Sequence, residues 1–261
     1  MKKIFRNTIN WVLRKFGFTT LSIKNLDMLV SKRKIAEEYL FLQKYPVSLI
    51  EKYLKYKTLS NAQLKQDLFA LMESKFKQDG YFVEFGATNG ISLSNTYLLE
   101  KEFNWTGILA EPSKCWHEEL ALNRQSIIDK RCVWKDSGEK LSFVEVENAI
   151  LSTVKGFGED DAHSERRKDS ISYTVESISL NDLLDYHKAP KIIDYLSIDT
   201  EGSELVILEG FDFTKYKFRS ITVEHNFSKN REGIYKLLTN AGYERVFEDF
   251  SSYDDWYKLR E

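Results

Sequence analysis

The 261-residue sequence has few of the features on which several protein classes depend. Its two cysteines, Cys115 and Cys132, show no CxxC spacing, which argues against a disulfide-built scaffold and a structural zinc site. No apolar run approaches the roughly 18 residues of a membrane span, and residues 1–18 lack the apolar core of a signal peptide. With only three prolines and 42% hydrophobic residues, we expect a folded protein in a reducing cytoplasm.

Charge is distributed unevenly along the chain. The net charge is −2, but residues 1–34 hold nine Lys or Arg residues against one acid, a local balance of +8. Apolar residues recur at helical spacing among these basic residues: Ile4, Phe5, Ile9, Val12, Leu13 and Phe16. The pattern fits a helix on the anionic inner face of a membrane, through residues 1–18, and equally a helix packed on the protein core. No basic and aromatic stripe occurs elsewhere, so nucleic acid is not an expected partner.

The first part of the chain reads as helical. We divide the sequence into a basic helical extension, residues 1–58, and a catalytic domain, residues 59–261. From Ile35 to Phe76 the apolar spacing predicts two or three helices. Ser60 and Gln63 stand in capping-box register, which predicts that the last helix begins there.

From Tyr81 onward short apolar runs alternate with helical patterns. The predicted strands are Tyr81–Phe85, Gly107–Glu111, Ile127–Trp134, Leu141–Val146, Ser172–Ile178, Ile193–Ile198, Arg219–Val223 and Tyr243–Phe247. This alternation predicts a doubly wound α/β fold with a mostly parallel, Rossmann-like seven-stranded sheet and helices on both faces. Ligands of such sheets bind beyond the carboxyl ends of the strands. The charged stretch Gly156–Asp169 is the candidate for a long loop or lid.

The first strand leads into a glycine-containing turn, Gly86-Ala-Thr-Asn-Gly90, followed by a predicted helix with Ser92 or Ser94 in its first turn. Glycines allow a tight turn that a ligand can approach, and the helix N-terminus offers free N–H donors. Two glycines after a strand are, by themselves, often only a turn. The dinucleotide fingerprint GxGxxG fails because positions 88 and 91 are Thr and Ile, which argues against NAD or FAD.

Two acids refine the cofactor prediction. Glu111 ends the second strand 21 residues after Gly90, the spacing at which an acid holds ribose hydroxyls in a nucleoside-binding unit. Glu84, just before the turn, would repel a pyrophosphate but could accept a hydrogen bond from an α-ammonium group. S-adenosylmethionine carries such a group. Here the sequence resembles the class I methyltransferases that use this cofactor, although their central glycine is replaced by Thr88.

A more specific resemblance covers nearly 200 residues, from Ser60 to Tyr257. Its sharpest part is Asp194-Tyr-Leu-Ser-Ile-Asp-Thr-Glu-Gly-Ser-Glu204, which is similar to the IDxEGxE motif of the FkbM methyltransferase family. The resemblance implies methyl transfer to an oxygen of a sugar, polyketide or other natural product, and we expect a sugar hydroxyl of a surface glycan or glycolipid. We assign the cofactor site to Glu84, Gly86, Ala87, Thr88, Asn89, Gly90, Glu111, Pro112, Ser113, Asp199 and Thr200.

The catalytic residues are predicted at the end of strand Arg219–Val223. Glu224, His225 and Asn226 follow this strand and share a sheet edge with Asp199. His225 is the candidate base for the acceptor hydroxyl, oriented by Asp199 or Glu224, because its ordinary pKa of about 6.5 suits proton transfer near neutrality. A histidine at a strand end is as often a structural hydrogen-bonding residue. Substrate contacts are predicted for Glu201, Asn226 and His163.

Several alternatives stay open. Asp199, Glu201, Glu224 and His225 could instead gather Mg²⁺ or Mn²⁺, since they combine hard oxygen ligands with one imidazole. Glu204 is expected to start a helix, with Gly202 in a tight turn. Gln63 and Asp67 either close over the cofactor or lie on an exposed helix face. A rival enzyme class is a metal-dependent nucleotide-sugar glycosyltransferase, in which Asp199-Thr-Glu201 would bind the metal, and a non-enzymatic rival is a membrane-docked binding module. The sequence fixes neither the acceptor nor the oligomeric state.

Overall fold

The structure is a computed structural model that describes residues 23–146, 149–157 and 170–260. The chain divides into two compact units, Met1–Lys44 and Tyr45–Glu261. The described part of the first unit is helix α2 (Ile23–Leu42), with exposed apolar side chains such as Leu26, Leu29 and Ile35. No helix in the described ranges is long and apolar enough to cross a bilayer. Residues 1–18, for which membrane contact is predicted, lie outside those ranges.

The second unit, Tyr45–Glu261, has two packed helices before its first strand. Helix α3 (Val47–Tyr56) packs against helix α4 (Gln66–Glu73). Tyr53 of α3 is fully buried, and the ring of Tyr56 lies 4.8 Å from that of Phe103. Helix α3 therefore contributes to the hydrophobic core of this unit.

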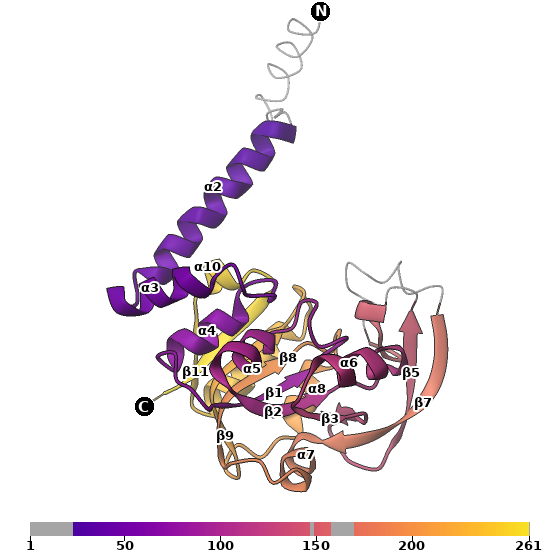
Figure 1. Cartoon of the computed structure of the whole chain (residues 1–261). Coiled ribbons are helices and arrows are strands. Elements are labelled where there is room, and N and C mark those ends of the chain that lie inside the picture. The colour runs from indigo at the N-terminus through magenta and orange to yellow at the C-terminus, as the bar shows by residue number, and fades with distance from the viewer. Residues whose placement is uncertain (1–22, 147–148, 158–169, 261) are drawn as a thin grey trace, which may run out of the picture. The chain divides into compact units, whose positions relative to one another are not determined.

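A mixed sheet of seven strands forms the centre of the second unit (Figure 1). Its strand order is β10 (Tyr243–Val246), β11 (Asp254–Leu259), β9 (Lys217–Glu224), β8 (Ile192–Ile198), β1 (Tyr81–Phe85), β2 (Thr106–Ala110) and β3 (Ile127–Asp129). The five strands from β9 to β3 are parallel, and β11 and β10 pair antiparallel at one side. The carboxyl ends of five strands therefore meet at one edge, and the α/β prediction is confirmed.

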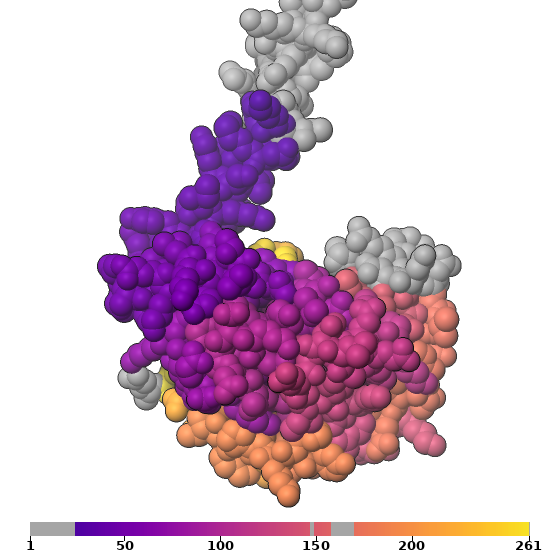
Figure 2. All heavy atoms as spheres, in the orientation of Figure 1, coloured from indigo at the N-terminus to yellow at the C-terminus, as the bar shows by residue number. Residues whose placement is uncertain are grey.

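Helices cover both faces of this sheet. Six consecutive residues of β8 are buried, and because side chains alternate between faces, both faces of β8 are covered. On one face, Leu183 of α7 (Leu180–Tyr186), Ile207 of α8 (Glu204–Glu209) and Leu238 of α9 (Arg231–Asn240) share a core with Tyr257. On the other, Phe69 of α4 stacks 4.8 Å from Trp256. Figure 2 shows that residues of the α3 to α6 region form much of the surface on the viewed side of this unit. The remaining short helices are α5 (Tyr97–Phe103), η1 (Lys114–Trp116), α6 (His117–Asn123), η2 (Ala149–Leu151) and α10 (Glu248–Ser251).

A second sheet departs from the predicted single alternating pattern. Its order is β4 (Cys132–Trp134), β7 (Ser170–Ser179), β5 (Lys140–Val146) and β6 (Thr153–Val154). The predicted strand Ile127–Trp134 is split, so that β3 belongs to the large sheet and β4 to the small one. At the break, Arg131 donates backbone and side-chain hydrogen bonds to Asp129, which turns the chain out of the large sheet. Strands β6 and β11 were not predicted.

The segment before α4 also differs from the prediction. Helix α4 begins at Gln66, after Lys65 in a left-handed conformation (φ 68°), so Ser60 and Gln63 do not form a capping box. Instead Ser60 Oγ donates to Asp67 Oδ1 at 2.6 Å, and the same oxygen accepts the Leu68 N–H at 2.7 Å. Asp67 is fully buried, which excludes an exposed face for this residue, whereas Gln63 is exposed in the loop before α4. The late start of α4 has a tertiary cause, because Ala62 in the preceding loop forms a β-bridge with Leu93.

Candidate active site

A pocket of about 410 Å³ opens at the carboxyl edge of the large sheet. Residues that follow β1, β2, β8 and β9 line it, together with η2, parts of the small sheet, Gln63 and Tyr253. Its volume lies in the range of roughly 300–1,000 Å³ found for small-molecule sites. The edge predicted from the strand pattern is therefore the edge that carries a cavity.

The turn after β1 is held by contacts within the protein. Gly86 has φ +74°, and a Cβ there would stand 2.0 Å from the carbonyl oxygen of Asp199. Gly90 has φ +80°, and a Cβ there would stand 2.6 Å from Cγ of Arg124. Both glycines are therefore required by the approach of neighbouring chain segments, whereas the sequence had suggested the approach of a ligand. Thr88, also left-handed at φ 47°, lines the pocket.

Glu111 joins the turns after β1 and β2. Its Oε2 accepts the Thr88 N–H at 2.8 Å, and its Oε1 accepts the Ser113 N–H at 2.7 Å. Burial raises the pKa of Glu111 to about 7, against the lowering effect of these two bonds. A carboxylate has about four lone-pair sites, so each oxygen can still accept one hydroxyl from the pocket. This arrangement suits a vicinal diol such as that of ribose.

Glu84 is more fully occupied by protein groups than predicted. Its carboxylate accepts hydrogen bonds from the Asn95 N–H at 2.7 Å and from the hydroxyls of Ser94 and Thr96, and Arg124 Nη1 lies 3.6 Å away. The predicted acceptor for an α-ammonium group is thus largely satisfied inside the protein, although Glu84 still lines the pocket. Because these bonds hold Ser94, Asn95 and Thr96 outside a helix, α5 begins at Tyr97, later than the predicted start near Ser92 or Ser94.

Asn95 supplies an acceptor that protein groups leave open. Its Nδ2 donates to Ser197 Oγ at 2.9 Å, while its Oδ1 is buried without a hydrogen-bond partner in the structure. Asn95 lines the pocket. A buried acceptor is costly to leave unpaired, so this atom favours a ligand with an N–H or O–H group.

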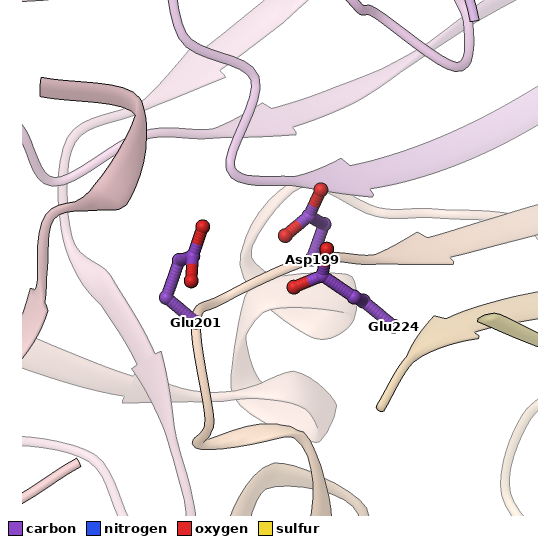
Figure 3. A group of neighbouring side chains, drawn as sticks. All are labelled: Asp199, Glu201 and Glu224. Atoms are coloured by element: carbon purple, nitrogen blue, oxygen red, sulfur yellow. The ribbon is translucent and has the colours of Figure 1, made fainter. Parts of the chain in front are cut away.

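Three carboxylates gather at one end of the pocket. Asp199 follows β8, Glu201 lies two residues further on, and Glu224 ends β9; one ligand oxygen of each lies within 4.8 Å of the others (Figure 3). Parallel pairing of β8 with β9 brings the two strand ends together, with Ile198 opposite Val223. The prediction that these acids share one edge agrees with their positions.

The turn after Asp199 has the predicted form. Glu201 and Gly202 have positive φ angles of 58° and 116°. Glu204 begins α8, and its Oε1 accepts the backbone N–H groups of Thr200 and Gly202, each at 3.0 Å. This cap closes the turn and leaves the side chain of Glu201 at the acid cluster.

The acid cluster holds protons more tightly than isolated carboxyl groups do. Burial raises the pKa of Asp199 to about 6, and the hydrogen bond to Glu224 opposes this rise. Burial, followed by repulsion from Asp199 and Glu201, raises the pKa of Glu224 well above its ordinary value. Both pKa values rise because burial and the neighbouring like charge disfavour the ionised form of each carboxyl group.

His225 does not face this cluster, which corrects the prediction of a histidine base. Glu224 and Asn226 line the pocket, but His225 does not, since successive side chains at a strand end point to opposite sides. Its Nδ1 accepts the Phe227 N–H at 2.9 Å, and its Nε2 lies 3.7 Å from Asp255 Oδ1. Burial lowers the pKa of His225 to about 4. His225 is therefore not among the pocket-lining groups that could act as a base or as a metal ligand.

The remaining predicted site residues divide into two groups. Pro112 and Thr200 line the pocket, whereas Ala87, Asn89 and Ser113 support its turns without lining it. His163 and most of the predicted lid lie outside the described residues. The pocket also contains residues that the sequence did not identify, chiefly the apolar group Cys132, Val133 and Phe143, and Tyr253, whose hydroxyl donates to Gln63 at 2.6 Å. In the sequence, only Asp254–Tyr257, the end of the stretch that resembles the FkbM family, points to the vicinity of Tyr253.

An α/β domain with this pocket, and with acids at or next to the carboxyl ends of β1, β2, β8 and β9, has the properties of an enzyme that binds a nucleoside-containing cofactor. The family model described as Methyltransferase FkbM domain matches residues 84–257. The chain therefore belongs to the FkbM methyltransferase family, and membership implies S-adenosylmethionine as the methyl donor. The resemblance seen in the sequence is confirmed.

The chain is similar to the solved structure of precorrin-6y C5,15-methyltransferase from Geobacter metallireducens GS-15, with 11% identity, a TM-score of 0.39, and coverage of 69% of this chain and 71% of that chain. No curated protein sequence matches the chain significantly.

Proposed function

We propose that this protein is an S-adenosylmethionine-dependent O-methyltransferase that acts on a sugar hydroxyl of a surface glycan, a glycolipid or another natural product. The observation that carries the proposal is the position of Glu111. It is a buried carboxylate that is held by two backbone N–H groups and lines the pocket. Ala110, Cys132, Val133 and Phe143 provide an apolar part of the same pocket for the adenine ring.

The charge of the pocket supports this cofactor. Five carboxylates line it (Glu84, Glu111, Asp199, Glu201 and Glu224), and within the described ranges no Lys, Arg or His does. S-adenosylmethionine carries a sulfonium and an ammonium against one carboxylate, so its net charge complements these acids. A nucleotide sugar would bring a diphosphate to a pocket without basic side chains. The glycosyltransferase alternative is therefore disfavoured by charge as well as by family membership.

The residues of the pocket would bind the cofactor, orient the acceptor and remove the proton of its hydroxyl. When bound, S-adenosylmethionine supplies an electrophilic methyl group on a sulfonium that leaves as a neutral thioether. Asp199 and Glu224, whose carboxyl groups lie together in the pocket, would accept the proton of the acceptor hydroxyl during methyl transfer. Gln63, Asn226 and Tyr253 offer amide and hydroxyl groups to a hydroxyl-rich acceptor. Much of the rate enhancement then comes from positioning.

The acid cluster gives one second candidate. Asp199, Glu201 and Glu224 form an oxygen donor set that suits Mg²⁺ or Mn²⁺, without the predicted contribution of His225. In that case the cation would lower the pKa of the acceptor hydroxyl, and the carboxylates would be its ligands. Methyl transfer that persists after exhaustive chelation would support the carboxylate base, and loss restored by Mg²⁺ would support the cation.

Calorimetric titration with S-adenosylhomocysteine tests the cofactor site. Saturable binding by the wild type supports the proposal, and no binding by folded protein contradicts it. The acceptor is then sought with radiolabelled S-adenosylmethionine and a panel of methyl glycosides and lipid-linked sugars. Glu224→Gln is expected to retain cofactor binding and to reduce methyl transfer about 100-fold, in the usual range for loss of a general base.

Peripheral membrane contact through residues 1–18 accompanies the glycolipid proposal. The basic charge of this segment is its support. Sedimentation of the full chain, and of a variant lacking residues 1–18, with vesicles containing anionic lipid tests it. Equal failure of both proteins to sediment would contradict membrane contact and leave the cofactor proposal intact.

A further inference from the structure

The turn after β9 has an unusual backbone. Asn226 and Phe227 are consecutive residues with positive φ angles of 44° and 56°. The left-handed conformation is sterically disfavoured for residues other than glycine, less for Asn than for Phe. Phe227 is also 71% exposed, so burial of its side chain does not hold the turn. Other contacts must therefore stabilise a conformation that the local sequence disfavours.

Two groups hold the turn from different sides. The carbonyl oxygen of Tyr253 accepts both the His225 N–H, at 2.9 Å, and the Asn226 N–H, at 3.1 Å. The imidazole Nδ1 of His225 accepts the Phe227 N–H at 2.9 Å. A side-chain acceptor that binds the N–H two residues ahead reproduces the geometry of an Asx-turn.

The surroundings of the imidazole fix its orientation. The ring is buried, and Phe227 packs on it edge-on at 5.3 Å. Asp255 of β11 faces Nε2 at 3.7 Å, and this carboxylate is in turn held by Arg231 of α9 and Arg245 of β10. Because Nδ1 is occupied by a backbone N–H, the neutral ring carries its proton on Nε2, which faces Asp255 on the side away from the pocket.

From this geometry we infer that His225 is a positioning residue: it fixes the turn that directs Glu224 and Asn226 into the pocket, and it does not carry the proton of the reaction. The inference rests on the proposed function only in that it makes this pocket the catalytic one. His225 acts through the Phe227 N–H and through the two neighbouring side chains. It touches none of the pocket space.

Three substitutions separate this role from others. In His225→Asn the side-chain oxygen stands close to the position of Nδ1, so the bond to the Phe227 N–H is retained. In His225→Gln the longer side chain brings its polar atoms to the position of Nε2, and His225→Ala removes the acceptor. We expect the Phe227 amide to exchange its hydrogen at least tenfold faster in the Gln and Ala variants than in the wild type, and within about threefold of the wild type in the Asn variant.

The wild-type ring provides a readout that does not depend on variants folding. Nitrogen-15 NMR of His225 at one pH should show the tautomer with the proton on Nε2 and Nδ1 as the acceptor. A proton on Nδ1, or an exchange rate of the Phe227 amide that is the same in all three variants, would overturn the inference. Calorimetry with S-adenosylhomocysteine on the wild type reports on the proposed function separately, since the predicted ribose acid Glu111 lies on a different turn.

Discussion

The Oε2 atom of Glu111 accepts a hydrogen bond of 2.8 Å from the backbone N–H of Thr88. The bond links the turn after β1 to the turn after β2. Glu111 therefore both forms the proposed ribose site and holds the turn that contains Thr88. Ser113 supplies the second backbone donor to the same carboxylate. Both the stability of the protein and its affinity for the cofactor should therefore depend on Glu111.

Glu111→Ala is expected to lose at least tenfold in affinity for S-adenosylhomocysteine, about 1.4 kcal/mol, because the ribose acceptors disappear. It should also be less stable, since two buried N–H groups lose their partner. Calorimetry and denaturant unfolding measure the two effects. The exposed acid Glu118 on α6 provides a matched control, Glu118→Ala. Equal affinity of the two variants would remove Glu111 from the site.

Gly86→Ala is expected to destabilise the protein far more than Gly138→Ala. Both glycines have positive φ, at 74° and 81°, so both substitutions carry the conformational cost of about 1 kcal/mol. Only at Gly86 would the new Cβ meet a backbone oxygen, that of Asp199 at 2.0 Å, whereas Gly138 has nothing within 4 Å. Denaturant unfolding of both variants isolates the cost of this close approach. Similar losses would mean that the turn after β8 can move aside.

Asp254 should make the protein less stable as pH rises. Burial raises its pKa from 3.8 to about 8, so between these values the native state holds a proton that the unfolded state has lost. The free energy of unfolding then falls with pH, by about 1.4 kcal/mol per unit for one full proton. Asp254→Asn keeps an oxygen acceptor for Gln66, which donates to Asp254 Oδ2 at 2.7 Å. In this variant the free energy of unfolding should fall less steeply between pH 4 and pH 8, by up to about 1.4 kcal/mol per pH unit.

Urea unfolding at several pH values between 4 and 8 measures this effect. The control is Asp249→Asn, an exposed acid of α10. A pH dependence that is the same in Asp254→Asn and in the wild type would contradict the assignment.

Arg124→Met is expected to cost about 3–5 kcal/mol, because it leaves the buried carboxylate of Glu84 without its cation and Glu100 with Lys101 alone. Combining it with Glu84→Gln should cost less than the sum of the two single losses, since the unpaired charge is then removed. Arg131, whose side chain is 27% exposed in its pair with Asp129, gives the control Arg131→Met. Denaturant unfolding compares all four variants, and equal losses for the two arginines would contradict a buried network.

Local pattern was sufficient for the elements that are regular and buried. The strand predicted at Tyr81–Phe85 has those bounds in the structure, and the predicted helix start at Glu204 is observed, because both depend on nearby residues. The split between β3 and β4, the strand β11 and the late start of α5 depend on contacts with distant segments. Ser94, Asn95 and Thr96, for example, are drawn out of the helix by Glu84, which lies on β1.

The sequence by itself determined the family, the α/β class, and which strand ends carry Glu111, Asp199 and Glu224, because motif spacing and hydrophobic alternation are local properties. Tertiary structure alone decided which of the neighbouring side chains face the pocket. Glu224 and His225 are adjacent in sequence, yet only Glu224 lines the cavity, while His225 is held by Phe227 and faces Asp255. The physical reason is that side chains alternate at a strand end, and only packing on both sides of the sheet fixes which side is the pocket.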